Sequence, residues 1–181
     1  MMKHFAFALA LAAPGIALAD NPFGELGKKA LDTATTEGTK AGKAELNKAV
    51  VSKLNAKLLA EGRKNQCSFK SDSDVLEAGC DAKAKRLANV LVDAKKTLAG
   101  AGFSGYRFVV AGHTDTSGDA GHNKELSQKR AAAIVRELAA RGVPAGEIDA
   151  VGMGAEKPLV KPDNTPAKKA KNRRYEVQVK I

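Results

Sequence analysis

The residue that most needs a chemical explanation in this sequence is Arg130. It lies in a run of residues spaced by four whose other members are all apolar, so its guanidinium falls within the buried stripe of a predicted helix. The apolar members of this run are Leu126, Ile134 and Leu138. A buried cation without an anionic partner is too costly, so Arg130 must meet a carboxylate of the protein or of a ligand.

Asp115 is the candidate carboxylate. It follows a predicted strand, in the polar turn at residues 112–118, and loops at strand ends commonly carry binding groups. Two interpretations are open. In one, Asp115 and Arg130 form an internal ion pair. In the other, they stay apart and bind a zwitterion, with Asp115 holding an ammonium and Arg130 clasping a carboxylate through two hydrogen bonds.

The elements that must position these groups alternate between helix and strand. Apolar residues at the 3.6-residue period predict helices at 80–99 and 124–141, with Asn123 as the N-cap of the second. Strands are expected at 68–69, 106–112, 148–151 and 175–181, and a loop at 155–171. The order β-α-β-α-β-β predicts an α+β domain, an α/β sandwich with helices on one face of a mixed sheet.

The segment upstream of this domain divides into two parts. Residues 1–19 combine a charged start, an apolar run too short to span a bilayer and a small-residue triplet, which predicts a secretory signal peptide. Residues 20–65 predict a helical arm, and the domain proper is expected at 66–181.

The predicted arm carries an apolar stripe that it cannot bury alone. The stripe consists of Leu46, Val50, Leu54 and Leu58. It must therefore pack on its own domain, on a second copy, or on a lipid surface. An outer-membrane or other envelope protein is a further expected partner of this arm.

Cys67 and Cys80 are the two cysteines of the chain. Export would place them in an oxidising compartment, where a disulfide is expected. It would close a loop of about 14 residues and stabilise the fold by roughly 3 kcal/mol. A metal site is the alternative, but it needs more ligands than two thiols and lacks a C-x-x-C spacing.

The charge of the chain points to anionic surroundings. The formal net charge is +10, which suits nucleic acid, phospholipid headgroups or an anionic cell wall. Export argues against nucleic acid, and so does the shortage of aromatic residues, since the chain has no Trp and two Tyr.

A motif of many positions surrounds Asp115 and Arg130. Its residues are Gly112-His-Thr-Asp115, Gly118, Asn123, Leu126-Ser127, Arg130-Ala131, Gly142-Val-Pro144, Val151-Gly152-Met-Gly154, Pro158 and Asn172-Arg173-Arg174-Tyr-Glu176-Val177. In order and spacing this motif resembles the OmpA-like peptidoglycan-binding domain, which is shared with the peptidoglycan-associated lipoprotein and flagellar stator proteins. The resemblance spans roughly residues 66–181.

The resemblance implies binding of meso-diaminopimelate in the stem peptides of peptidoglycan. Carried over by position, Asp115 and Arg130 grip the ligand, while Asn123 and Arg173 line the same pocket. It also implies a periplasmic protein of a Gram-negative envelope, with association to the outer membrane left open. No cofactor and no metal are expected.

Two other functions stay open at this point. His113 and His122 flank Asp115, so a metal-dependent or acid–base enzyme that processes peptidoglycan is one alternative. No serine or cysteine nucleophile arrangement accompanies them, and we expect the protein not to be an enzyme. The other alternative is a self-associating envelope protein whose basic surface contacts the wall nonspecifically.

Overall fold

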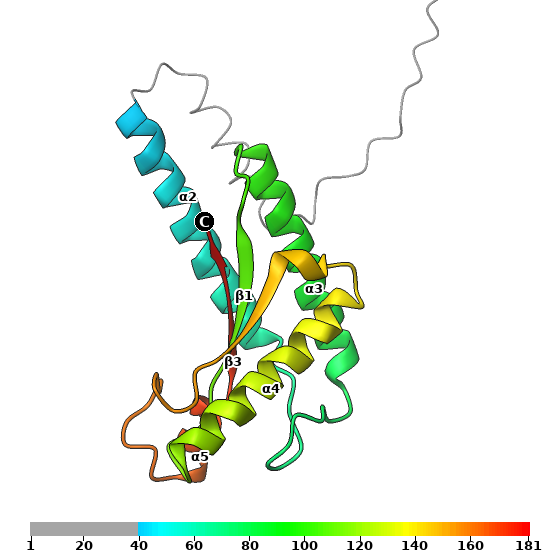
Figure 1. The fold of residues 1–181 in the computed structure, drawn as a ribbon, viewed down its shortest axis with the longest axis vertical. Coiled ribbons are helices and arrows are strands. Elements are labelled where there is room, and N and C mark those ends of the chain that lie inside the picture. The colour runs from blue at the N-terminus through cyan, green and yellow to red at the C-terminus, as the bar shows by residue number, and fades with distance from the viewer. Residues whose placement is uncertain (1–39) are drawn as a thin grey trace, which may run out of the picture.

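The computed structural model describes residues 40–181. The elements run in the order α2 (Lys40–Lys64), α3 (Cys80–Gly100), β1 (Arg107–Gly112), α4 (Ala120–Ala139), the 3-10 turn η2 (Ala145–Glu147), β2 (Ile148–Gly152), α5 (Pro166–Asn172) and β3 (Tyr175–Lys180), as Figure 1 shows. The expected signal peptide at 1–19 and the first half of the arm lie outside the described residues. Within those described, no helix is long and apolar enough to cross a bilayer.

The three strands form one mixed sheet in the order β2-β1-β3. β1 runs parallel to β2 and antiparallel to β3, so Val110 lies between Ala150 on one side and Val177 on the other. These three strands agree with the sequence prediction to within a residue at either end.

The first expected strand, near residues 68–69, is not part of this sheet. Phe69 forms a single antiparallel bridge with Leu76. The polar residues between them reverse the chain at once, with the Lys70 amide donating to the Val75 carbonyl at 2.9 Å. A turn this tight leaves no length for a strand, which corrects that part of the prediction.

The core lies on one face of the sheet. Alternate strand residues such as Phe108, Val110, Val177 and Val179 are buried in one cluster with apolar residues of α2, α3 and α4. The fold is therefore the expected mixed α/β arrangement, with helices on the core face of the sheet.

Helix α2 packs on its own chain, which answers where the arm's apolar stripe goes. Leu54 and Leu58 have no exposed surface and belong to the same core cluster as the sheet. In Figure 1, α2 runs alongside β3, the strand at one edge of the sheet.

Two side-chain amides close the free edge of β3. Asn55 accepts a hydrogen bond from the Val179 amide at 2.7 Å and donates to the Val179 carbonyl at 3.1 Å. The side chain of Gln66 likewise accepts a hydrogen bond from the Tyr175 amide at 3.0 Å and donates one to the Tyr175 carbonyl at 2.8 Å. Both amides thus replace the backbone of a neighbouring strand, and they satisfy groups that would otherwise invite pairing with another chain.

Helix α5 was missed by the sequence analysis, which expected a loop at 155–171. Thr165 caps it and Pro166 occupies its first turn, both regular helix-start signals. Seven residues carry too little apolar periodicity to be recognised as a helix. Asn172, at its end, is fully buried and bonds the backbone of Leu159 and Val160.

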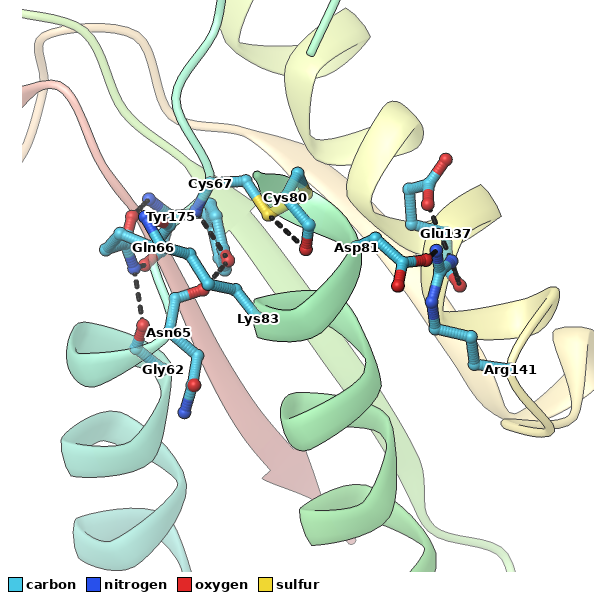
Figure 2. The surroundings of a disulfide bond; sticks show 10 residues. All are labelled: Gly62, Asn65, Gln66, Cys67, Cys80, Asp81, Lys83, Glu137, Arg141 and Tyr175. Atoms are coloured by element: carbon cyan, nitrogen blue, oxygen red, sulfur yellow. Dashed lines mark hydrogen bonds and ion pairs between the residues drawn. A yellow bond between two sulfur atoms is a disulfide. The ribbon is translucent and has the colours of Figure 1, made fainter. Parts of the chain in front are cut away.

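The expected disulfide is present between Cys67 and Cys80. Figure 2 shows it joining the segment that follows α2 to the first residue of α3. Both cysteines are buried within the core cluster.

Candidate functional site

The four residues predicted to form the site line one cavity of about 1010 Å³. Asp115 comes from the turn after β1, Asn123 and Arg130 from α4, and Arg173 from the junction of α5 and β3. Residues far apart in the sequence therefore line the same cavity.

Glycines allow α4 to lie directly against the strand ends that carry this turn. A side chain on Gly112 would overlap the carbonyl oxygen of Ser127, and a Cβ on Gly152 would lie 2.6 Å from both the Gln128 nitrogen and the Lys124 oxygen. The Ser127 hydroxyl also accepts a hydrogen bond from the Gly154 amide at 2.8 Å. Only glycine permits contact this close, so the strand ends fix the position of α4.

Asn123 differs in role from the sequence prediction. The N-cap of α4 is Asp119, whose extended backbone lets its side chain accept from the His122 amide at 2.8 Å. Asn123 lies one turn later, is 7% exposed, and donates from Nδ2 to the Ser117 carbonyl at 2.7 Å. It therefore ties the turn that carries Asp115 to the helix that carries Arg130.

Asp115 pairs with Arg173. Its Oδ2 accepts from Arg173 Nη1 at 2.8 Å, and its Oδ1 accepts from the Ser117 amide at 3.0 Å. Burial alone would raise the pKa of Asp115, but the hydrogen bonds from Arg173 and Ser117 together outweigh it and lower the pKa below its ordinary value. The carboxylate is thus held ionised at the cavity wall.

Arg130 meets neutral oxygens rather than a carboxylate. Its Nε donates to the Ser73 carbonyl at 2.8 Å and its Nη2 to the Lys70 carbonyl at 3.3 Å, while the guanidinium lies 5.2 Å from the Phe69 ring centroid. Burial, followed by repulsion from Arg173, lowers its pKa. Neither of these carbonyls neutralises the charge, and a guanidinium has five N–H donors.

These contacts do not form an internal ion pair between Asp115 and Arg130, which was one of the two interpretations open from the sequence. Asp115 has Arg173 as its ion-pair partner, whereas Arg130 lines the same cavity with no carboxylate of the described residues at ion-pair distance. Arg130 interacts with Asp72, Asp115 and Asp74 only at longer range. A carboxylate and a guanidinium with spare bonding capacity on one cavity can receive a molecule that carries both an ammonium and a carboxylate.

A sequence model of the OmpA family matches residues 68–173, more than half of the chain. This chain belongs to the OmpA family. The resemblance expected from the motif is thereby confirmed, and the matched segment contains all four predicted site residues.

Relatives and solved structures agree with this assignment. Outer membrane protein A of Klebsiella pneumoniae is 42% identical over 80 residues, which cover 40% of this chain and 23% of that protein. The peptidoglycan-binding protein ArfA of Mycobacterium bovis is 41% identical over 73 residues, covering 40% and 22%. The crystal structure of the peptidoglycan-associated lipoprotein from Burkholderia pseudomallei has a TM-score of 0.52 at 28% identity, covering 64% of this chain and 89% of that one. This chain thus matches less than a quarter of the length of these two sequence relatives.

In this OmpA-family chain the two histidines near Asp115 have different neighbours. His113 is buried, with Nε2 3.9 Å from Glu176 Oε2, and His122 Nε2 lies 2.7 Å from Asp72 Oδ1. Burial, with repulsion from Arg174, lowers the pKa of His113 to about 4. Among residues 40–181 no three His, Cys, Asp or Glu side chains are grouped as a metal would require.

The surroundings of Arg130 are the part of the site that sequence reasoning missed. Its partners are the ring of Phe69 and two backbone carbonyls, those of Lys70 and Ser73. Every residue has a carbonyl, so no residue type marks one as a binding group. An aromatic residue near a short turn was the single available signal.

Proposed function

We propose that this chain binds peptidoglycan non-covalently, through the diaminopimelate of the stem peptide. The observation that carries the proposal is the half-buried guanidinium of Arg130, which faces neutral carbonyls on the cavity that Asp115 also lines. Membership of the OmpA family supports it, as does the name of the relative ArfA, a peptidoglycan-binding protein.

The free end of diaminopimelate is chemically complementary to this cavity. Its amino-acid centre carries an ammonium and a carboxylate, and the stem peptide leaves that centre free where it is not cross-linked. Arg130 would bind the carboxylate with its remaining N–H donors, and Asp115 would accept from the ammonium. Arg173 keeps Asp115 ionised, and Asn123 keeps its turn against α4.

The charged side chains of the cavity suit binding of the stem peptide rather than catalysis of a reaction on it. We propose that residues 66–181 form the wall-binding domain, that residues 1–19 direct export to the periplasm, and that residues 20–65, whose helix α2 packs on this domain, link it to other envelope components. Binding without hydrolysis would anchor or organise the cell envelope, since many weak sites along one polymer add up by multivalency.

The test is sedimentation with purified sacculi that contain diaminopimelate. Asp115→Ala and Arg130→Ala should each abolish binding. Arg107→Ala is the matched control, because Arg107 is an exposed arginine at the start of β1 that pairs with Asp149 and does not line the cavity. It should bind as the wild type does.

Salt and wall chemistry separate this proposal from its rivals. Pocket binding should resist added salt, whereas general attraction to a basic surface should fade with screening. Sacculi with lysine in place of diaminopimelate lack the free carboxylate and should bind poorly. Equal sedimentation of all variants would contradict the proposal, and release of soluble muropeptides would show an enzyme.

A further inference from the structure

The loop between Cys67 and Cys80 supplies the hydrogen-bond acceptors and the aromatic ring that the Arg130 guanidinium contacts. It contributes the carbonyls of Lys70 and Ser73 and the ring of Phe69. These contacts orient a side chain that would otherwise sample many rotamers, since arginine has a large side-chain entropy. The position of the Arg130 guanidinium thus depends on where this loop lies.

The two ends of the loop are held firmly. The Cys67 amide donates to the Tyr175 hydroxyl at 3.2 Å, and Tyr175 in turn donates to the Asn65 carbonyl at 2.5 Å. At the other end, Cys80 is buried and is the first residue of α3, so the helix and the core hold it in place (Figure 2). The disulfide joins these two anchored points directly.

Apart from the contacts with Arg130, residues 71–74 at the tip of the loop are held to the rest of the protein by exposed side chains. Asp72 contacts His122 and Asp74 pairs with Arg136, both at the surface, where such pairs contribute little. The loop also folds on itself through the Phe69–Leu76 bridge and the hydrogen bond from the Lys70 amide to the Val75 carbonyl. The disulfide adds to these contacts, because a cross-link restricts the conformations of the segment that it closes.

We propose that the Cys67–Cys80 disulfide is a positioning element for Arg130, so that opening it weakens binding of the stem peptide. The proposal rests on the function proposed above. A dithiol reductant opens the bond in a balanced exchange: the disulfide takes up two electrons and two protons to give two thiols, and the dithiol becomes a cyclic disulfide. The cavity's own charged groups are unchanged by this step.

The experiment is calorimetry with the tripeptide L-Ala-γ-D-Glu-meso-diaminopimelate. The Cys67→Ala/Cys80→Ala variant should bind about tenfold more weakly than the wild type, as if one charge-assisted hydrogen bond were lost. Wild-type protein reduced with dithiothreitol should match the variant and recover its affinity on re-oxidation. Circular dichroism establishes that each sample is folded at the temperature used.

A double-mutant cycle separates positioning from general loss of stability. In an Arg130→Lys background, which lacks the forked guanidinium, removing the disulfide should change the affinity less than twofold. An equal loss in both backgrounds would mean that the disulfide does not act through Arg130, and the inference would be wrong.

A second variant tests the same idea with the disulfide intact, in case the double alanine variant does not fold. Phe69→Leu removes the ring beside the guanidinium and should weaken binding roughly threefold in the wild-type background only. Phe103→Leu is the matched control, since Phe103 packs against the core and does not line the cavity. No difference between the two leucine variants contradicts the inference.

The outcomes also distinguish this inference from the function on which it rests. If the wild-type protein does not bind the tripeptide, both fail. If the wild type binds and the disulfide-free protein binds equally well, only the positioning role of the disulfide fails.

Discussion

Polar side chains contact backbone groups both at the edge of β3 and at the wall of the cavity. The two regions differ in whether these contacts satisfy the side chain completely. At the edge, the amides of Asn55 and Gln66 each donate and accept, so two neutral partners satisfy each other fully. At the cavity, Arg130 donates to two carbonyls and keeps its charge.

This difference indicates what each region is for. Complete pairing of neutral groups stabilises the fold and leaves nothing for a ligand. A cation beside a cavity that has no carboxylate at ion-pair distance adds little to stability and can form its ion pair with a molecule from outside. Substitutions at the two regions should therefore change different measured quantities.

The largest expected effect is on affinity, at Arg130. Arg130→Leu should weaken binding of the stem peptide by at least about a hundredfold, roughly 3 kcal/mol, because the ligand carboxylate loses its cation. The free energy of unfolding should stay within about 1 kcal/mol of the wild type, since a half-buried charge is replaced by an apolar group. Calorimetry measures the affinity and urea unfolding measures the free energy of unfolding. A large loss of stability in Arg130→Leu would contradict the proposed difference between the cavity and the edge of β3.

The next effect is on stability in acid and involves His113, a buried residue whose ring nitrogens have no hydrogen-bond partner in the structure. Its pKa falls from 6.5 in the unfolded chain to about 4 in the fold. The unfolded chain therefore takes up a proton that the folded protein resists, and stability should decline as the pH falls from 6.5 to 4, by up to about 3 kcal/mol.

Unfolding by urea at pH 7 and pH 4.5 tests this dependence. His113→Leu should lose less stability between the two pH values than the wild type does. His122→Gln is the control, because His122 is exposed, and it should keep the wild-type dependence. Identical pH dependence in all three proteins would argue against His113 as the source.

A smaller effect on stability is expected at the closed edge. Asn55→Ala leaves the amide and carbonyl of Val179 without their partner and should lower the free energy of unfolding by about 2 kcal/mol. Binding of the stem peptide should be unchanged, since Asn55 does not line the cavity. Ser52→Ala, an exposed change on the same helix, should alter neither quantity.

The smallest effect concerns the pH dependence of binding. The hydrogen bonds that lower the pKa of Asp115 keep it charged, so the ammonium site should persist to a lower pH than an ordinary aspartate would allow and be lost as Asp115 takes up a proton. Arg173→Gln removes the main hydrogen bond that lowers this pKa and should move the loss of binding to higher pH. An unchanged midpoint would mean that another group controls it.

Much of this fold follows from local pattern. The helix at 80–99 and the strands beginning near 107, 148 and 175 were predicted closely, because each shows clear periodicity over its length. The prediction was wrong where a helix is too short to show periodicity and where two residues could each cap the same helix. Helix α5 has seven residues, and Asp119 precedes Asn123 as a capping residue four positions earlier.

The sequence by itself indicated that Arg130 needs an anion, because residue type and helical spacing place a guanidinium in an apolar stripe. The resemblance to the OmpA-like motif added the expectation that Asp115 shares a pocket with it, and the expected export of the chain predicted that the two cysteines pair. Only the tertiary structure decided that Arg173 pairs with Asp115, that carbonyls of a disulfide-closed loop hold Arg130, and that α2 covers the edge of the sheet. Such pairings join segments separated by up to 124 residues, and the last two depend on backbone groups that every residue carries, so no local pattern specifies them.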